Sequence, residues 1–436
     1  MSVFTLDMIE KIAKRLREPD WITELRRRAL RTHAELPWPH PSDDIWRRTD
    51  VSLLDPGQGF APAEPPLLQS LALDEAELAA ITQPLGDEAL LVRANGAWVS
   101  QPEAPGIMVE ELSAAAQASP EPIRAILEAD GLSQAERKLA SLNDAFHHDD
   151  LVVRVPAGAE LERPVRLVRA FSAGPRQAIF PMTLVTVGAA ASVTLIEESL
   201  SFAPPGTDQG PLVHNRIELV LEPGASVRYV RLQRWDARAR EFLLQRATLA
   251  RGASLTMANL TLGAAVSKVH VITKLAGPGA STRLYGFVFG RGSQHVDQHT
   301  LQDHQAPQTS SDLQYRAALQ DESRMVYTGL IRIAPAAAQA NAYQANHNLL
   351  LSRAARAETI PMLEILADDV QCKHGASIGP VDDEQAFYLM SRGIPRDAAQ
   401  RLLVMGFIEP VLEQIPFAPL RDRLRQEIEG ELHEDH

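Results

Sequence analysis

The sequence predicts a mainly β protein, with a β-solenoid core (residues 146–378) between helical domains at residues 1–145 and 379–436. Two observations predict the core. After residue 146 the apolar residues alternate in short runs, and a Gly-Ala turn sequence recurs about every thirty residues, which is typical of stacked repeats that share one core. The turn sequence is found around Gly158, Gly188, Gly224, Gly252 and Gly279. A β-sandwich also has short, evenly spaced strands, but a recurring turn sequence favours the solenoid.

The N-terminal domain is predicted to be helical. Apolar residues between Phe4 and Leu25 recur mostly every three or four positions, and Pro19 separates two helices. Residues 37–66 contain WPHPSDD, DPGQGF and APAEPP, a proline-rich stretch that cannot sustain a helix and predicts an irregular connection. We expect short helices to resume at residues 74–82 and 109–145.

The C-terminal domain returns to helical spacing. Asp382 and Asp383 can cap a helix, Gly393 can end it, and Pro395 can begin the next. A second amphipathic helix and a third from Pro419 to Leu432 complete a small helical unit.

Composition excludes several classes of protein. The 436 residues are 45% hydrophobic and 23% charged, which is typical of a globular protein and excludes disorder as the main state. A formal net charge of -13 argues against nucleic acid as a partner. No stretch approaches the roughly 18 uncharged apolar residues of a membrane span, and the N-terminus lacks the apolar core of a secretion signal. The expected location is the cytoplasm.

The single cysteine, Cys372, excludes a disulfide within the chain and any cysteine-rich metal site built by this chain alone. If residues 363–374 form a strand, Cys372 and His374 project from the same face. A thiolate and an imidazole are two of the four ligands of a tetrahedral metal site, so another chain or other residues would have to complete it. The alternative is a buried thiol beside a solvent-facing histidine without a ligand role.

Three other kinds of pattern bear on possible chemistry: nucleotide-binding motifs, a nucleophile elbow and a histidine cluster. No phosphate-binding P-loop or dinucleotide fingerprint occurs. The segment GASIG places Ser377 in a nucleophile-elbow pattern, in which the catalytic histidine follows the serine in the chain. Here only His433 and His436 follow it. A small-residue turn before the helical unit is therefore favoured, and a serine hydrolase is a remote alternative.

A histidine cluster, His295, His299 and His304, lies in a segment predicted to be a strand. On a strand, His295 and His299 share one face and His304 points away, so a shared metal site is the less favoured interpretation. Asp297 and Asp303 could form ordinary hydrogen bonds with their neighbours.

Several long motifs in the C-terminal half resemble the SufB/SufD family of iron-sulfur cluster assembly proteins. They are MVYTGLIRI, QANAYQANHNLLLS and PMLEILADDVQCKHGASIGPVDDEQAFYLMSRGI, supported by LNDAFHHDDLVVRVPAGAELERPVRLV and DQHTLQDHQAPQTSSD. The resemblance covers roughly residues 142–415. It implies a right-handed parallel β-helix flanked by helical domains, and a non-catalytic scaffold subunit.

The resemblance also implies partners. In the family, SufB and SufD pair through their β-helices, and the C-terminal helical domain of each binds one copy of SufC, an ATPase of the ABC type that supplies the missing P-loop. Here the docking region corresponds to the helices from Asp383 to Arg392 and from Arg396 onward. Its candidate contact residues are Phe387, Tyr388, Met390, Ser391, Arg392 and Gly393.

Within the family, the length and the single cysteine resemble SufD, since SufB-type subunits are usually longer and richer in cysteine. His374 matches a SufD histidine implicated, with a SufB cysteine, in cluster assembly at the subunit interface, and Cys372 matches a position often filled by cysteine. The resemblance implies a transient iron-sulfur cluster at that interface and, in some members, a reduced flavin. It implies no cofactor that this chain alone would bind stably. The alternative is a SufB-like scaffold that holds a nascent cluster as a homodimer.

Overall fold

The computed structural model describes residues 4–63, 75–101, 104–172, 176–202 and 210–432. The helices of these residues are α1 (Leu6–Leu16), α2 (Asp20–Glu35), the 3-10 turns η1 (Val51–Leu54) and η2 (Pro56–Gln58), α3 (Glu75–Thr82), α4 (Leu112–Ala118), α5 (Pro120–Leu127), α6 (Gln134–Phe146), α7 (Asp383–Ser391), α8 (Arg396–Leu412) and α9 (Ala418–Glu431). Most of the remaining described residues are in strands.

The strands before and at the start of the core are β1 (Ala61–Pro62), β2 (Ala89–Ala94), β3 (Ala97–Ser100), β4 (Met108–Glu111), β5 (Asp149–Val155), β6 (Val165–Ser172), β7 (Gln177–Ile179), β8 (Pro181–Val187) and β9 (Ser192–Phe202). Those that follow are β10 (Leu212–Leu221), β11 (Ser226–Arg234), β12 (Arg240–Leu249), β13 (Ser254–Thr261), β14 (Val266–Leu275), β15 (Ser281–Gly290), β16 (His295–His304), β17 (Ser310–Leu319), β18 (Arg324–Ile333), β19 (Asn341–Leu350), β20 (Arg356–Ile365) and β21 (Gln371–Pro380).

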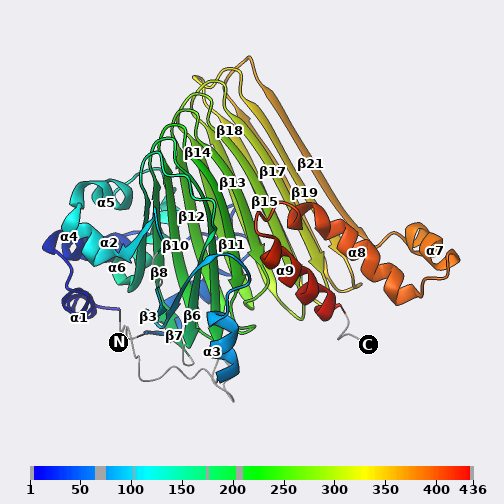
Figure 1. Ribbon diagram of the computed structural model, residues 1–436, viewed down its shortest axis with the longest axis horizontal. Helices are drawn as coiled ribbons and strands as arrows, with labels where there is room; N and C mark the ends of the chain where they lie inside the picture. Colours follow the sequence, from blue (N-terminus) through cyan, green and yellow to red (C-terminus); the bar gives the residue numbers. More distant parts are fainter. Residues whose placement is uncertain (1–3, 64–74, 102–103, 173–175, 203–209, 433–436) are drawn as a thin grey trace.

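The core strands stack into two facing parallel sheets (Figure 1). The first sheet has the order β20-β18-β16-β14-β12-β10-β8-β5-β4, and the second has the order β21-β19-β17-β15-β13-β11-β9-β6-β2-β3. The chain therefore alternates between the sheets and climbs one rung at a time. The prediction of a β-solenoid with helices at both ends is confirmed.

The recurring Gly-Ala turns connect the first sheet to the second. Gly224 and Gly252 have φ values of 73° and 66°, in the left-handed region that glycine adopts without strain. The alanines that follow them, Ala225 and Ala253, are fully buried. The small side chain fits inside the turn, which explains why the pair recurs.

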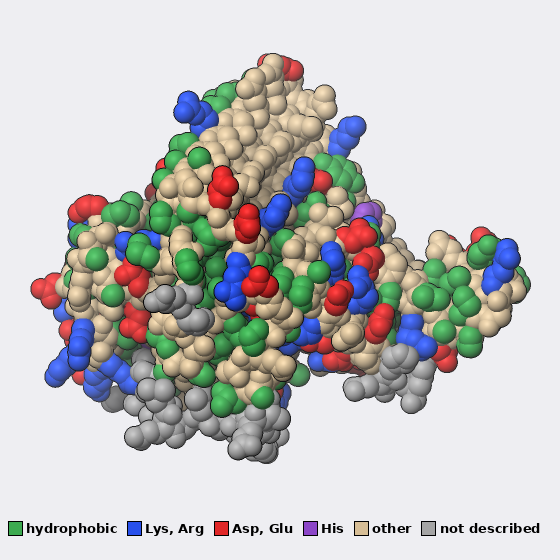
Figure 2. Space-filling view, viewed as in Figure 1, with side chains coloured by type: hydrophobic (Ala, Val, Ile, Leu, Met, Phe, Trp, Pro, Cys, Tyr) green, Lys and Arg blue, Asp and Glu red, His purple; other side chains and the backbone are tan. Residues whose placement is uncertain are grey.

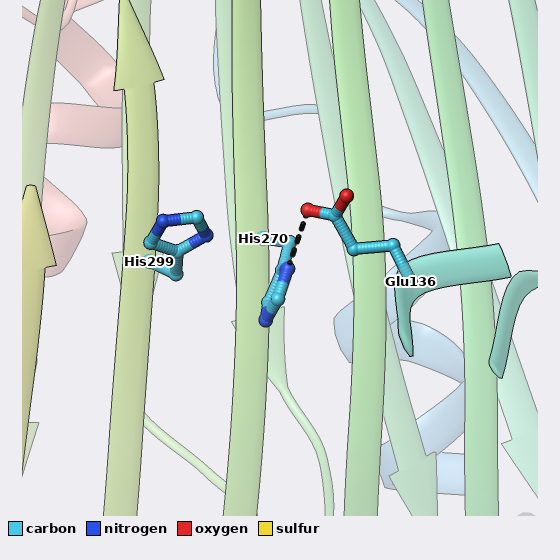
Figure 3. Close-up of side chains that lie close together, drawn as sticks. All are labelled: Glu136, His270 and His299. Carbon is cyan, nitrogen blue, oxygen red and sulfur yellow. Dashed lines mark hydrogen bonds and ion pairs between the residues drawn. The ribbon is translucent and has the colours of Figure 1, made fainter. Parts of the chain in front are cut away.

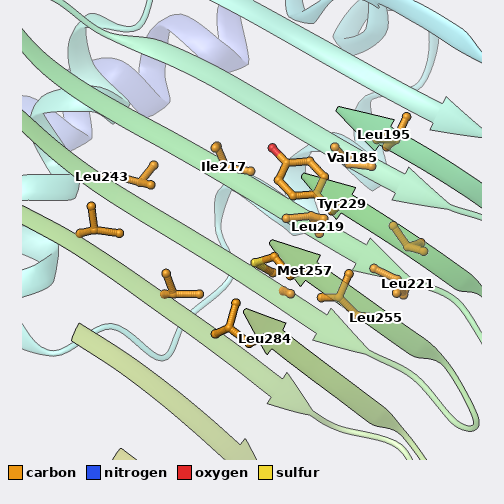
Figure 4. Close-up of a cluster of buried hydrophobic side chains, with 14 of the residues drawn as sticks. Val185, Leu195, Ile217, Leu219, Leu221, Tyr229, Leu243, Leu255, Met257 and Leu284 are labelled. Atoms are coloured by element: carbon orange, nitrogen blue, oxygen red, sulfur yellow. The ribbon is translucent and has the colours of Figure 1, made fainter. Parts of the chain in front are cut away.

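Apolar side chains from both sheets fill the space between them. Residues from β10, β12 and β8 on one sheet face residues from β9, β11, β13 and β15 on the other (Figure 4). Leu219, Leu255 and Met257 are typical members of this cluster and are almost completely buried. Inward and outward side chains alternate along each strand, as the period-two pattern requires.

Helices cover the outer faces of the sheets. The N-terminal helices α1 and α6 pack on the first sheet through a cluster that includes Ile9, Leu139 and Phe242. Helices α8 and α9 pack on the second sheet, where Val404 and Leu424 join residues of β11, β13, β15 and β17. In Figure 1, α7 lies beyond this packed region at the right of the molecule.

The N-terminal region also contains strands that the sequence analysis did not predict. Strand β2 extends the second sheet, and the short strands β3 and β4 pair antiparallel with β2 and β5. These strands cap the first rungs of the solenoid, so the N-terminal domain is helical only in part. Their sequences are too short to give a clear period.

Candidate functional site

The last rung of the solenoid has two open strand edges. Among the described strands, β20 pairs only with β18, and β21 pairs only with β19. In β18 most residues are buried, whereas β20 and β21 are exposed or half-buried along their length. This contrast arises because no further rung covers them. We call the surface formed by β20, β21 and the residues between them the open end.

Apolar side chains lie on the open end. Ile378 of β21 is 43% exposed, and Leu366, just after β20, is 55% exposed. Leu363, Ile365 and Tyr343 are also exposed large hydrophobic residues in this region. A long strand edge with exposed apolar residues is a template for pairing with another chain, and soluble proteins normally protect such edges.

Cys372 and His374 both lie on β21. The predicted single strand over residues 363–374 is wrong, because β20 ends at Ile365 and β21 begins at Gln371. The two side chains still share a face, since they are two residues apart on one strand. They lie in register with Ala342 and Gln344 of β19, both of which are buried. Cys372 and His374 are therefore on the strand face that continues the inward-facing side of the rung below.

The surroundings of these two side chains differ. Cys372 is half-buried and packs against a small apolar cluster that contains Ile331, Ile333 and Ala342, whereas His374 is exposed. Burial raises the pKa of the Cys372 thiol, which disfavours the thiolate that binds metal. In the part of the chain that the structure describes, no third histidine, cysteine or carboxylate joins them in a group able to hold a metal ion.

Ser377 lies in the middle of β21. The predicted turn at residues 375–379 is wrong, because these residues pair in register with residues 345–349 of β19. Ser377 is exposed and its Oγ is 2.7 Å from Nδ1 of His347, a partner that the sequence analysis did not consider. A nucleophile elbow needs a sharp turn from strand to helix, and β21 has none at this position. His433 and His436 lie outside the described residues.

The predicted strand at residues 295–304 is confirmed, with its histidines on opposite faces. His295 Nε2 is 3.0 Å from the Thr49 hydroxyl on the outer face, whereas the ring of His304 contacts the hydroxyls of Thr309 and Ser311, each at 2.8 Å. His299 shares the outer face with His295 but lies beside His270 and Glu136. The three histidines therefore do not form one site.

The two acidic residues of this strand have ordinary partners, as the sequence suggested. Asp297 accepts hydrogen bonds from Lys268 at 2.7 Å and from Thr49 at 2.5 Å. Asp303 accepts from Arg332.

The predicted docking residues lie on and just after α7. Asp382 caps α7 by accepting from the backbone N–H groups of Glu384 and Gln385, and Gly393 follows its end with φ of 87°. Among the α7 residues, Ala386 is buried, while Phe387 and Tyr388 are 70% and 58% exposed. Figure 2 shows hydrophobic side chains gathered over this projecting helix.

Met390, Ser391, Arg392 and Gly393 are also exposed. The Arg392 guanidinium lies over the Tyr388 ring at 5.2 Å. We call the exposed side chains of residues 387–393 the α7 surface.

The most informative feature of the open end, its lack of a covering rung, could not be found from the sequence. The alternation of apolar and polar residues in β20 resembles that of a buried strand. Only the helical unit that follows Pro380 indicates in the sequence that the repeats end there. The buried group of Glu136, His270 and His299 was also missed, because its members are far apart in the chain. Among the described helices, none is both long enough and apolar enough to cross a membrane.

Comparisons with known proteins agree with the fold and the motifs. Residues 170–407 match the family model described as "SUF system FeS cluster assembly, SufBD core domain". The chain is 27% identical to the iron-sulfur cluster assembly protein SufD of Bacillus subtilis, with 97% of each chain covered. It is 25% identical to an iron-sulfur cluster assembly SufBD family protein of Staphylococcus epidermidis, over 98% of this chain and 94% of the relative.

A Mycobacterium leprae protein with the same family description is 34% identical over 226 residues, which cover 50% of this chain and 58% of that protein. The family match spans more than half of the chain and includes the solenoid strands from β7 to β21. The chain therefore belongs to the SufBD family of iron-sulfur cluster assembly proteins.

Proposed function

We propose that this chain is the SufD-type subunit of a cytoplasmic SufBCD complex, in which it is a non-catalytic scaffold for iron-sulfur cluster assembly. The observation that carries the proposal is the difference between the two ends of the solenoid. The first rungs are capped by β3 and β4, whereas β20 and β21 keep open edges. The full-length similarity to a protein named SufD supports the choice of subunit type.

The open end is the proposed contact with a SufB-type subunit. Ten-residue strands such as β20 and β21 present a row of backbone N–H and C=O groups to a partner strand. Backbone hydrogen bonds would supply affinity, and the exposed apolar side chains beside them would add buried area. A second solenoid that joins here would extend both sheets.

His374 is the proposed contribution of this chain to the cluster. It is exposed on the open end, where a cysteine of the partner could complete a site that this chain cannot build alone. An imidazole is a suitable ligand for iron without deprotonation of a thiol. Cys372 is the weaker candidate, since burial raises the pKa of its thiol and its side chain packs in an apolar cluster. A cluster would be transient at this interface, and a reduced flavin could bind to the whole complex.

The α7 surface is the proposed dock for a SufC-type ABC ATPase. Its aromatic side chains are exposed on a helix that contacts the rest of the chain mainly through α8. Movement of a bound ATPase would be transmitted to the solenoid through α8 and α9. These helices are fixed to the second sheet by apolar packing and by the ion pair between Arg423 and Glu198 at 2.8 Å. Closure of two ATPases would then pull on the paired solenoids and open their interface.

Co-purification from the native cytoplasm tests the proposal. The tagged chain is expected to recover an ABC-type ATPase and a cysteine-richer homologue, identified by mass spectrometry. An I378K variant should lose the homologue, and an F387A variant should lose the ATPase. Recovery of neither protein by the unmodified chain would contradict the proposal.

The SufB-like alternative makes a different prediction, because the open end could also pair with a second copy of this chain. In that case the isolated protein would be a homodimer that develops a cluster chromophore on addition of iron and sulfide.

A further inference from the structure

A group of two histidines and one glutamate lies buried between α6 and the outer face of the first sheet. Glu136 comes from the first turn of α6, His270 from β14 and His299 from β16 (Figure 3). One donor atom from each residue lies within 4.8 Å of the other two. The exposed fractions of the three residues are 7%, 0% and 4%.

The hydrogen bonding of this group is incomplete. Glu136 Oε1 and His270 Nδ1 are 3.0 Å apart and form a hydrogen bond. Within the described residues, neither ring nitrogen of His299 has a hydrogen-bond partner, and the same is true of Nε2 of His270. Buried polar atoms are nearly always paired with protein, water or an ion, so three unpaired imidazole nitrogens in one pocket call for an occupant.

We propose that Glu136, His270 and His299 hold a divalent transition-metal ion of the zinc or iron class. Two imidazoles and one carboxylate are a donor set typical of both ions. With bonds of 2.0–2.2 Å, neighbouring donors around a tetrahedral ion are about 3.4 Å apart, close to the 3.0 Å between Glu136 Oε1 and His270 Nδ1. The ion would take the place of the hydrogen bond between these two atoms, and the proton of the neutral His270 ring would then be on Nε2. A modest rotation of the His299 ring, which no hydrogen bond restrains, brings the third donor into range.

The electrostatics of the pocket suit a cation. Burial lowers the pKa of both His270 and His299, which favours the neutral imidazole that binds a metal ion. Lys268 on β14, whose charge acts on both rings, is paired with Asp297 at 2.7 Å, which offsets its repulsion. Glu136 contributes the negative charge, and its second oxygen accepts from Ser133 in the capping box of α6.

Such an ion would join the N-terminal domain to the middle of the solenoid. Its ligands connect α6 with two neighbouring strands, in which His270 and His299 are in register. The site is distant in sequence from the open end and from the α7 surface. The site does not depend on a partner chain, so its test is independent of the proposed function.

The test is metal analysis of tag-free protein expressed in medium supplemented with Zn²⁺, together with Co²⁺ absorption spectroscopy and thermal unfolding. The matched variant is H299F. Position 299 continues a row of rings in edge-to-face contact, in which Phe242, His270 and His299 follow one another at centroid distances of 5.7 Å and 4.8 Å. Phenylalanine at position 299 therefore preserves the packing and removes the ligand. An E136Q variant keeps the hydrogen-bonding shape and removes the charge.

The unmodified protein is expected to carry stoichiometric Zn²⁺, to show the visible bands of Co²⁺ in a nitrogen and oxygen site, and to gain several degrees in Tm over the apo form. H299F should fold but lose the metal, the bands and the Tm gain, and E136Q should lose affinity at least tenfold. H295A and H374A are controls that should retain the metal. Metal-free protein after supplementation, or equal metal content in H299F, would overturn the proposal.

Discussion

His374 of β21 lies in register with Gln344 of β19, yet Gln344 is 1% exposed and His374 is exposed. The Gln344 amide donates to the backbone oxygen of Gly329 across the interior of the solenoid, whereas the next rung that would cover His374 does not exist. His374 therefore occupies an inward-facing position of the repeat at the point where the repeat stops. A partner that continues the solenoid would enclose it.

Charge on the open strand edges should prevent pairing. L363K and I378K each place a lysine on the open end, at positions of β20 and β21 that are 38% and 43% exposed. We expect each variant to weaken binding of a SufB-type subunit at least tenfold, about 1.4 kcal/mol, in a titration by surface plasmon resonance. V99K, on the exposed face of β3 at the opposite end of the solenoid, is the control and should bind normally. Unchanged affinity in both edge variants would place the contact elsewhere.

Truncation of an aromatic residue on α7 should weaken binding of the ATPase without loss of stability. Phe387 and Tyr388 are mostly exposed, so F387A and Y388A leave the core intact, while aromatic residues commonly supply much of the binding energy of an interface. The expected result is at least a tenfold higher Kd for the SufC-type ATPase, measured calorimetrically, with an unchanged Tm. The control is L6A, which removes from α1 an apolar side chain that is 52% exposed. If L6A and F387A behave alike, the α7 surface is not the dock.

Removal of the His374 imidazole should impair cluster formation but leave the complex assembled. H374A is expected to lower the initial rate of cluster formation by the reconstituted complex at least tenfold, followed by the growth of visible absorbance. H347A is the control, because His347 lies nearby on β19 but is bonded to Ser377. A C372A variant should have a smaller effect than H374A, since Cys372 packs in an apolar cluster. An H374A complex that forms clusters at the normal rate would exclude a role for this side chain.

The repeat and its turns can be recognised in the sequence only where glycine occupies the turn. In the later turns, Gln308 and Gln339 have φ values of 58° and 60° and occupy the left-handed position that Gly252 fills earlier. The fold therefore continues beyond the part where the sequence repeat can be recognised. Side-chain hydrogen bonds and packing in the stacked rungs offset the modest cost of this conformation.

The candidate sites differ in how much of their geometry could be predicted from the sequence. Cys372 and His374 could be placed on one strand face because they are two residues apart. The partnership of Ser377 with His347, and that of Glu136 with His270, depends on register between strands or on docking of α6, and the residues concerned are 30 and 134 positions apart. Contacts of this kind arise from stacking of the rungs and have no local signature.

Stability should depend on pH through Asp150, the second residue of β5. Its Oδ2 is 2.5 Å from Nδ1 of His147, and Arg26 approaches the same nitrogen at 2.9 Å. An Nδ1 that accepts from Arg26 carries no proton, so Asp150 can hydrogen-bond to it only as the donor, in its protonated form. Burial raises the pKa of Asp150 to about 7 and lowers that of His147. Because the folded-state pKa is raised, the stabilisation is present at low pH and is lost as the pH rises through about 7.

The D150N variant should remove this dependence, since an amide can donate to Nδ1 at every pH. We expect the free energy of unfolding of the unmodified protein to fall by about 2 kcal/mol between pH 5 and pH 8 relative to D150N, as measured by urea denaturation. D87N alters an exposed ion pair with Arg163 and should show no such difference. Parallel pH curves for D150N and the unmodified protein would mean that Asp150 is ionised throughout.

Substitution by alanine should change the free energy of unfolding in opposite directions at two glycines. At Gly286 on β15 an added Cβ would lie 2.1 Å from a carbon of the Tyr315 ring, which itself packs against Tyr327. G286A is therefore expected to lower the free energy of unfolding by about 2 kcal/mol or more. At Gly430 in α9 no atom of the described residues lies within 4 Å of the added atom, and G430A should increase stability slightly because alanine favours a helix. Chemical denaturation of the two variants compares them directly, and a neutral G286A would show that the Tyr315 ring can move aside.

Hydrogen exchange of the chain alone and in complex with its cysteine-richer homologue tests the central claim most directly, because it reads the backbone N–H groups of the open strands themselves. Pairing at the open end predicts that amides of β20 and β21 exchange slowly in the complex and much faster in the isolated chain, while amides of β12 and β14 are equally protected in both. Unchanged exchange in β20 and β21 on formation of a stable complex would contradict the account.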